Sequence, residues 1–404
     1  MAEKESGVTV RLPLAGYRIL SAEQYGAGPY GTMFLAQMGA EVIKIESPQA
    51  GDTARAVGPH YLRPGESLYF QTFNLNKKSL TLDLNTAEGQ AILHRLAASS
   101  HAMVNNLRGD LPERLGLTYA AMKEANPAIV CAHLSAYGRD NERARWPGYD
   151  YLMQAEAGWL ALTGEPEAPP TRAGLSLVDF MTGTIMTIGL LGALIDAQRS
   201  GVGLDMDVDL LSAAVHQTSY PAVWYLNEGD VTTRAPRSAH PSVTPSQMVR
   251  AADGWVFVMA QLPKFWGILV DRIGHPELAA DSRFATPADR LANRDALTDI
   301  LDGIFGAKPV AHWIDLLAGH MPVSPVHGLD QALDNPYLAE KGMIDTISHP
   351  DRDDLRVLSN PIRFDGERLP NRAAPLLGAD TDAILAGEGF GADEIAALRE
   401  KGVV

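Results

Sequence analysis

Strand-like and helix-like segments alternate through the first half of the chain. Helical patterns such as Tyr30–Met38 and Ala87–Ala98 separate short apolar runs that have the length and composition of buried strands. These runs are Tyr17–Ser21, Glu41–Ile45, Ser79–Leu82, Ala102–Val104 and Ile129–Leu134. Strands that alternate with helices are typical of a parallel sheet covered by helices on both faces. The sequence therefore predicts an α/β fold with a mainly parallel, doubly wound sheet.

The pattern changes to shorter elements after about residue 220. A strand or hairpin is expected near Gly254–Ala260, and helical patterns follow at Phe265–Ile273, Arg290–Phe305, Val310–Leu317, Thr381–Leu385 and Ala392–Glu400. A chain of 404 residues is long enough for two or three domains. We expect a large domain that begins in residues 1–220, a small domain in residues 221–330, and a C-terminal segment in residues 331–404.

The composition excludes several classes of protein. The net charge of −15 argues against nucleic acid and anionic membrane surfaces as partners. The single cysteine, Cys131, excludes an intrachain disulfide and is expected in a buried strand, and the scattered histidines predict no metal site. The first residues, MAEKESGVTVRL, lack the apolar core of a signal peptide, and no long uninterrupted apolar run predicts a membrane span. We expect a cytoplasmic protein.

A glycine-rich turn follows the first predicted strand. Gly26–Gly31, with Glu46 twenty residues beyond Gly26, comes close to a dinucleotide-binding fingerprint. However, the preceding residues Ser21–Tyr25 are long and polar for a turn that places a pyrophosphate directly on a helix. We therefore interpret the segment as a glycine-rich turn with Pro29 near the start of a helix.

One carboxylate stands before a long helical pattern. In TRAGLSLVDFMTG, Asp179 precedes a helix expected over Gly183–Arg199. Aspartate is a common N-cap residue, so Asp179 could simply cap this helix. It could also be a catalytic carboxylate, because the start of a helix favours a negative charge. The residues alone leave both interpretations open.

Several longer segments together resemble the family III CoA-transferases, which include formyl-CoA transferase and the related α-methylacyl-CoA racemases. The resemblance covers nearly the whole chain in the same order. Its main segments are AGPYGTMFLAQMGAEVIKIESP with GDTAR, LYFQTFNLNKKSLTLDLNTAEG, NNLRGDLPERLGLTYAAMKEANPAIV, the Asp179 segment, and APLLGADTDAILAGEGFGADEIAALREKGVV. The resemblance implies an interlocked homodimer of ring-shaped chains. It also implies a Rossmann-like large domain, built from both ends of the chain, with a small α/β domain inserted.

The resemblance also implies a chemistry for particular residues. Asp179 occupies the place of the family's nucleophilic aspartate, and Tyr149 with Asp150 matches an aromatic and acidic pair beside the active site. The racemases carry a histidine at the place of Tyr149 as a proton-transfer base. A phenol with a pKa near ~10 is a poor base at neutral pH, so the transferases are favoured.

Further residues are implied in substrate and CoA binding. The resemblance assigns Gln24, Gly26, Tyr69 and His240, together with the Tyr149–Asp150 pair, to the substrate site, and it assigns Arg55, Leu82, Asn106 and Arg114 to CoA. Three departures argue against formyl-CoA and oxalate as substrates. The chain has Ser47 where the family often has an arginine, and Gly26 where formyl-CoA transferase has a glutamine. It also has SAHPSVTPSQ (residues 238–247) where formyl-CoA transferase has a mobile glycine-rich loop.

The expected activity is CoA transfer between carboxylic acids, with the CoA thioester as substrate and no further cofactor. Asp179 would form an anhydride with the donor acyl group and then a thioester with CoA. We expect succinyl-CoA as donor and a small di- or hydroxycarboxylic acid as acceptor. The alternatives are a 2-methylacyl-CoA racemase that uses Asp179 and Asp150 as bases, and a CoA-binding protein without catalysis.

Overall fold

The computed structural model describes residues 10–404 of the chain. These residues form two compact units. The first combines residues up to 157 with residues 174–219 and 336–404, and the second combines residues 158–173 and 220–335. Both ends of the described chain therefore belong to one unit. Residues 1–9, where the sequence lacks a signal-peptide pattern, lie outside the described part.

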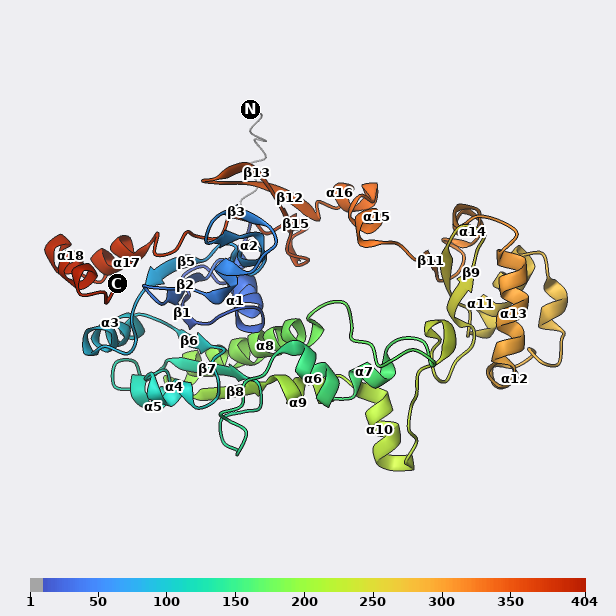
Figure 1. Cartoon of the computed structure of the whole chain (residues 1–404), viewed down its shortest axis with the longest axis horizontal. Coiled ribbons are helices and arrows are strands. Elements are labelled where there is room, and N and C mark those ends of the chain that lie inside the picture. The colour runs from blue at the N-terminus through green and yellow to red at the C-terminus, as the bar shows by residue number, and fades with distance from the viewer. Residues whose placement is uncertain (1–9) are drawn as a thin grey trace. The chain divides into compact units, whose positions relative to one another are not determined.

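A six-stranded parallel sheet forms the centre of the first unit (Figure 1). Its order is β5-β2-β1-β6-β7-β8, with bounds Arg18–Ala22 (β1), Glu41–Glu46 (β2), Lys78–Thr81 (β5), Ala102–Asn105 (β6), Val130–Ser135 (β7) and Asp205–Asp209 (β8). The chain proceeds from β1 to β5 on one side and returns to pair β6 with β1 before it continues to β8. Open parallel sheets bind ligands at such a reversal, beyond the carboxyl ends of the strands. The predicted α/β fold with a parallel sheet is confirmed.

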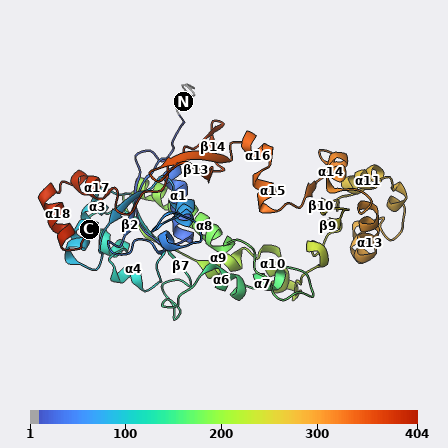
Figure 2. The same ribbon diagram turned by 45° about the horizontal axis from the view of Figure 1, so that its top comes forward.

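Helices cover both faces of this sheet (Figures 1 and 2). One face carries α3 (Ala87–Ala98), α17 (Thr381–Gly387) and α18 (Ala392–Glu400), whose apolar side chains pack on the strands in one buried cluster. The C-terminal segment is also hydrogen-bonded beside β5, where the backbone N–H of Thr81 donates to Thr381 Oγ1 at 3.0 Å. The opposite face carries α1 (Ala27–Gln37) and α8 (Leu177–Ser200).

Helices α1 and α8 cross each other at glycines. A Cβ atom on Gly31 would lie 2.5 Å from the carbonyl oxygen of Gly183, and a Cβ atom on Gly183 would lie 2.3 Å from that of Ala27. Only glycine permits so close an approach of two backbones. The crossing brings the first turn of α8, which carries Asp179, against the first turn of α1.

Among residues 10–404, α8 is also the one helix that is long and apolar enough to cross a membrane by length and composition. Buried core helices meet the same criterion, so this helix is weak evidence for a membrane span.

Most predicted elements are present, and three of the strands that were not predicted are rich in charge or lie beside charged residues. Strand β8 has the sequence DMDVD, and the hairpin β12–β13 (Ile344–His349 and Arg352–Leu358) contains DRDD. Neither shows the apolar run that marks a buried strand. The other short elements of this unit are Thr53–Ala56, β3 (Tyr61–Arg63), β4 (Glu66–Ser67), α2 (Leu68–Asn74), α4 (Leu111–Arg114), α5 (Tyr119–Met122), α6 (Asp150–Glu156), α9 (Leu210–His216), α16 (Pro336–Glu340), β14 (Arg363–Phe364) and β15 (Glu367–Arg368).

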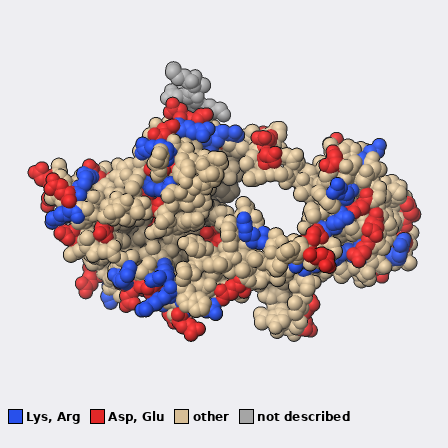
Figure 3. All heavy atoms as spheres, in the orientation of Figure 1, with Lys and Arg blue, Asp and Glu red and all other residues tan. Residues whose placement is uncertain are grey.

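The second unit packs helices on a small antiparallel sheet with the order β11-β10-β9. The predicted helix Arg290–Phe305 is divided at Asn293 into two. On the face drawn in Figure 3, acidic and basic side chains are interspersed over this unit. Its elements are α7 (Trp159–Leu162), α10 (Ser219–Glu228), Pro236–Ser238, β9 (Ser246–Arg250), β10 (Trp255–Met259), α11 (Pro263–Arg272), Pro276–Ala279, α12 (Pro287–Ala292), α13 (Arg294–Phe305), α14 (Val310–Leu317), β11 (Val323–Pro325) and α15 (Leu329–Leu333).

Two glycines of α8 give a matched test of the helix crossing. Gly183→Ala should destabilise the protein by about 1–3 kcal/mol, because the new methyl group overlaps a backbone carbonyl of α1. Gly192→Ala places its methyl group where no atom lies within 4 Å, so it should be neutral or slightly stabilising. Chemical denaturation of both variants measures the difference, and equal stabilities would show that the helices do not require the close crossing.

Candidate active site

Asp179 lies in the first turn of α8, and its residue is only 9% exposed. The predicted start of this helix at Gly183 is therefore wrong, because α8 begins at Leu177 and its N-cap residue is Ser176. Val178 is fully buried, so the residues before Gly183 form part of the packed helix. This earlier start also excludes Asp179 as the N-cap.

A second carboxylate fills the capping role instead. Asp150, the first residue of α6, accepts the backbone N–H of Asp179 at its Oδ2 atom with a distance of 3.0 Å. Its Oδ1 atom accepts the side-chain amide of Gln154 at 2.6 Å. Among residues 10–404, no such hydrogen bond to the Asp179 carboxylate occurs. Asp150 thus holds the backbone at the start of α8, while the Asp179 side chain is left to face the cavity.

The environment of Asp179 makes its carboxylate unusually basic. Burial, together with the nearby negative charge of Asp150, raises the pKa of Asp179 to about 7. From the sequence, the start of the helix was expected to favour the charged form of Asp179. The structure differs because burial and a like charge both oppose ionisation. At neutral pH the group therefore divides between a basic carboxylate and its acid.

Tyrosine side chains surround this carboxylate. The ring of Tyr25 lies 5.3 Å from that of Tyr69 on α2 and 5.9 Å from that of Tyr149 (centroid distances). Burial, with the charges of Tyr25 and Asp179, raises the pKa of Tyr69, so this phenol keeps its proton and can donate a hydrogen bond. Tyr25 was missed in the sequence. The sequence offers one indication of its role, which is that Tyr25 directly precedes Gly26 in the glycine-rich turn. The turn holds Tyr25 at a positive φ of 68°.

Gly26 leaves open the space beside the carboxylate. A Cβ atom on Gly26 would lie 2.9 Å from Asp179 Oδ2 and 3.8 Å from the hydroxyl oxygen of Tyr69. A larger side chain would therefore displace the carboxylate or fill the space next to it. The structure thus brings together Asp179, Gly26 and Tyr69, three of the predicted site residues, and their roles stay predictions.

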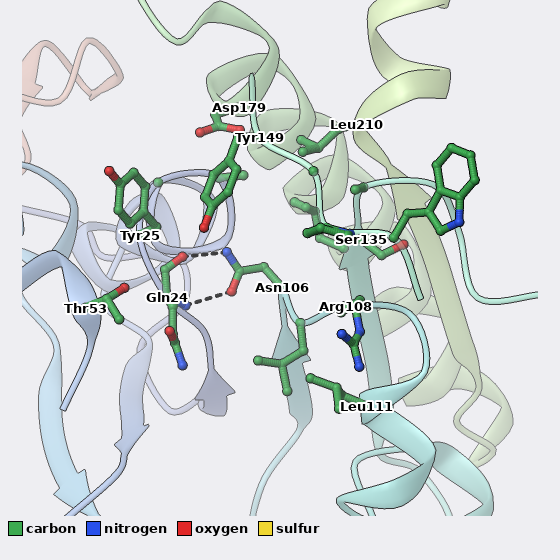
Figure 4. Close-up of a pocket in the computed structure, with 18 residues that line it drawn as sticks. Gln24, Tyr25, Thr53, Asn106, Arg108, Leu111, Ser135, Tyr149, Asp179 and Leu210 are labelled. Atoms are coloured by element: carbon green, nitrogen blue, oxygen red, sulfur yellow. Dashed lines mark hydrogen bonds between the residues drawn. The ribbon is translucent and has the colours of Figure 1, made fainter. Parts of the chain in front are cut away.

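A cavity of about 300 Å³ opens at these residues (Figure 4). Gln24, Gly26, Asn106, Tyr149 and Asp179, all predicted site residues, line it. Asn106 fixes one wall, because its side chain donates to the carbonyl oxygen of Gln24 at 2.6 Å and accepts the backbone N–H of Gln24 at 2.7 Å (Figure 4). This pair of hydrogen bonds joins the loops after β1 and β6, at the reversal of the sheet.

A neighbouring cavity of about 250 Å³ shares Gln24 and Leu107 with the first. Leu82, predicted to contact CoA, lines this second cavity, as does Ser47. The two cavities therefore meet at the carboxyl ends of the central strands.

Two arginines and a histidine from the predicted site are not among the residues that line these two cavities. Arg55 is buried, bound to Glu46 and Glu66 and stacked 3.8 Å over the ring of Phe70, an arrangement that does not support its predicted contact with CoA. Arg114 ends α4 and lines neither cavity. His240 belongs to the second unit, where its ring stacks on Tyr220 at 5.5 Å. The roles of these residues stay predictions.

A set of buried charges beneath the loop that follows β1 was not predicted from the sequence. Lys44 pairs with Asp52 at 2.9 Å, Lys77 pairs with Glu23 at 2.7 Å, and all four side chains are fully buried. No spacing rule reveals these pairs, because their members are brought together only by the folded sheet. Within residues 10–404 there is no group of three or more His, Cys, Asp or Glu residues that could hold a metal ion.

Comparison with known proteins decides the family. The sequence model of CoA-transferase family III matches residues 14–381. The chain belongs to CoA-transferase family III. It is 32% identical over 406 residues to an acyl-CoA transferase of Fusarium pseudograminearum, with 97% of this chain and 88% of that protein covered. It is 31% identical over 376 residues to the succinyl-CoA:glutarate CoA-transferase of Mus musculus, with 92% and 86% covered.

A solved structure agrees with this assignment. A CAIB/BAIF family protein from Brucella suis superposes with a TM-score of 0.82 at 30% identity, covering 94% of this chain and 100% of that one. The predicted resemblance is confirmed, and this family III enzyme is a CoA-transferase that acts on acyl-CoA and carboxylic acids.

The raised pKa of Asp179 predicts how stability depends on pH. Between pH ~4, where an unfolded aspartate ionises, and pH 7, the folded CoA-transferase keeps a proton that the unfolded chain releases. Stability is therefore lost as pH rises through this window, on the order of a few kcal/mol in full. Asp179→Asn removes this cost, so its thermal unfolding midpoint should exceed that of the parent at pH 8, with a gap that shrinks toward pH 4.5.

Asp196→Asn is the matched control, because Asp196 is an exposed aspartate on the same helix. Its midpoint should follow that of the parent at every pH. A destabilised Asp179→Asn variant at pH 8 would mean that the folded protein stabilises the ionised carboxylate.

Proposed function

We propose that Asp179 is the covalent nucleophile of CoA transfer. Its carboxylate attacks the thioester carbonyl of the donor, the C–S bond breaks, and CoA leaves as a thiolate, so that a mixed anhydride of Asp179 and the donor acid remains. The thiolate then attacks the Asp179 carbonyl, which releases the donor acid as a carboxylate and leaves an aspartyl-CoA thioester. The acceptor carboxylate repeats these two steps in reverse order and regenerates Asp179.

The observation that carries this proposal is a buried carboxylate that faces a cavity without a hydrogen-bond partner among residues 10–404. An ionised carboxylate is a weak nucleophile, and hydrogen bonds would weaken it further. Burial has the opposite effect, because a carboxylate with a pKa of about 7 is more basic and more reactive. The Tyr69 phenol borders the same space next to Gly26, so it can donate to the oxyanion that forms at the attacked carbonyl.

The two cavities suggest how CoA lies. The nucleotide part fits the cavity lined by Leu82 and Ser47, and the pantetheine arm passes Gln24 and Leu107 toward Asp179. Arg108 lines the catalytic cavity and is half exposed in its pair with Asp110. It is therefore available to a phosphate group of CoA. The steps require no cofactor beyond the CoA thioester itself.

We propose succinyl-CoA as donor and a small di- or hydroxycarboxylic acid, such as glutarate, as acceptor. The similarity to the succinyl-CoA:glutarate CoA-transferase of Mus musculus supports this choice. A panel of succinyl-, acetyl- and formyl-CoA against glutarate, succinate and oxalate, followed by mass spectrometry of the CoA esters, tests it. The proposal requires the succinyl-CoA and glutarate pair to be among the fastest.

The alternative activity is racemisation of a 2-methylacyl-CoA, with Asp179 and Asp150 as bases. Incubation with 2-methylacyl-CoA in deuterated water separates the two activities. Exchange at the α-carbon in the absence of an acceptor acid would favour the racemase. Tight binding of acyl-CoA without any turnover would favour a protein that only binds CoA.

We also propose a homodimer with interlocked chains. Apolar side chains that a soluble subunit normally covers are exposed on α8 and α9, including Ile188 (66% exposed), Ile195 (51%) and Val215 (50%). Light scattering should give the mass of two chains. Tagged and untagged dimers mixed at low concentration should not exchange subunits without unfolding, and rapid exchange would exclude interlocking.

Trapping of the intermediate tests Asp179 directly. Enzyme incubated with succinyl-CoA and no acceptor should hold the aspartyl thioester, which borohydride reduces to an alcohol. The tryptic peptide 173–199 then loses one oxygen and gains two hydrogens. Fragmentation must place this change on Asp179, because Asp196 lies in the same peptide and serves as an internal control.

Kinetics of two variants complete this test. Asp179→Asn should fold but lose nearly all transfer, and Asp179→Glu, which moves the carboxylate by one methylene, should lose ~10²-fold or more. Substantial transfer by the Asn variant, after deamidation is excluded, would remove Asp179 from the mechanism.

A further inference from the structure

Lys77, next to the start of β5, has a fully buried side chain that contacts three segments of the chain close to the catalytic cavity. Its Nζ atom donates to Glu23 Oε1 at 2.7 Å, to the carbonyl oxygen of Pro29 at 3.0 Å and to Asn74 Oδ1 at 3.0 Å. An ammonium group has three donors, so these contacts use all of them.

The three acceptors lie on the elements that deliver the groups around Asp179. Glu23 begins the loop that carries Tyr25 and Gly26, and Pro29 lies in the first turn of α1, just after Gly26. Asn74 is the last residue of α2, the helix that carries Tyr69. Lys77 therefore fixes Gly26 and Tyr69 relative to each other.

A second buried ion pair, between Lys44 and Asp52, contacts the same loop. Lys44 donates to the carbonyl oxygen of Glu23 at 2.8 Å and pairs with Asp52, whose Oδ1 atom accepts the backbone N–H of Tyr25 at 3.1 Å. Glu23 also accepts the Thr32 hydroxyl at 2.6 Å. Buried charged residues thus hold the loop at Glu23 and at Tyr25.

We propose that the Lys77–Glu23 ion pair positions Gly26 and Tyr69 against Asp179, so that CoA transfer requires the charged form of Lys77. Lys77 does not line the catalytic cavity, and it acts through the loop and α2 rather than on the substrate. This role of Lys77 rests on the proposal that Asp179 is the nucleophile, and the experiments below distinguish a failure of one from a failure of the other.

The charged residues around Lys77 determine the pH at which the Lys77–Glu23 ion pair is lost. Burial lowers the pKa of Lys77 to about 8, with Glu23 and Asp52 acting against the shift and Lys44 adding to it. Burial alone would raise the pKa of Glu23, but Lys77 and Lys44 together hold it below its usual value. On an alkaline titration, Lys77 is therefore the member of the pair that loses its charge.

Activity and stability should respond to this deprotonation in opposite directions. The folded chain gives up the Lys77 proton near pH 8, whereas an unfolded lysine keeps it to pH ~10.4. Between these values the unfolded state binds more protons, so the contribution of Lys77 to stability rises with pH. A loss of transfer above pH 8 in a fully folded enzyme is thus a sign of positioning and not of unfolding.

The test is the alkaline limb of kcat/KM in Glu23→Gln, measured with succinyl-CoA and glutarate or with a faster pair from the panel. This substitution keeps the shape and the acceptor oxygen of the side chain but removes the negative charge that holds the Lys77 proton. The alkaline limb should move to lower pH by about one unit or more, because loss of an opposite charge within hydrogen-bond distance shifts a pKa by ~1–3. Thermal unfolding at each pH must show that the variant stays folded.

Lys78→Gln is the matched control, since Lys78 is adjacent, exposed and paired with the surface residue Glu41. Its alkaline limb should not move. An unmoved limb in Glu23→Gln, or an equal shift in Lys78→Gln, would overturn the positioning role. Borohydride trapping on Asp179 in the parent enzyme would still succeed in that case, whereas its failure would count against the nucleophile instead.

Discussion

Buried charges beneath the loop that follows β1 are the constraint on which the candidate active site of this CoA-transferase depends. Each charge loses its hydration in the interior, and only a well-placed partner offsets that loss. The chain meets this condition with pairs whose members are far apart in sequence, including Glu23 with Lys77 and Lys44 with Asp52. A misplaced strand or loop would leave a buried charge unpaired, so the network selects one arrangement of β1, β2, α1 and α2.

Asp179, in the same region, is a buried carboxylate that has no such partner among residues 10–404. Its neighbour Asp150 accepts two hydrogen bonds, yet the Asp179 carboxylate accepts none from residues 10–404. The Asp179 carboxylate can stay without a hydrogen bond only if the residues around it are held rigidly. A flexible loop would move a hydrogen-bond donor toward the negative charge. The close glycine crossing of α1 and α8 and the paired charges beneath it supply that rigidity. The enzyme thus keeps a destabilised, reactive carboxylate at the expense of stability at neutral pH.

The sequence predicted the sheet well because its central strands are continuous apolar runs, such as Ile129–Leu134, and it predicted helices such as α3 to the residue. Strand β8 was not predicted because three of its five residues are aspartates, and it is recognised as a strand only from its pairing with β7. At the site, the resemblance to the family located Asp179, Gly26 and Tyr69. It could not show that Arg55 forms ion pairs with Glu46 and Glu66, nor that the side chain of Tyr25 lies against that of Tyr69. Both features depend on side-chain contacts between residues that are distant in sequence.

The geometry also bears on which of two chemistries this carboxylate performs. A racemase needs two bases, one to remove the α-proton and another to return it on the opposite face. Asp179 is basic enough for one role, but Asp150 already uses both oxygens to hold the Asp179 backbone and Gln154. Tyr149 offers a phenol in place of an imidazole. Transfer needs only one reactive carboxylate and neutral donors around it. The site therefore favours the proposed anhydride route, because Asp150, which would have to serve as the second base of a racemase, instead holds the backbone of Asp179.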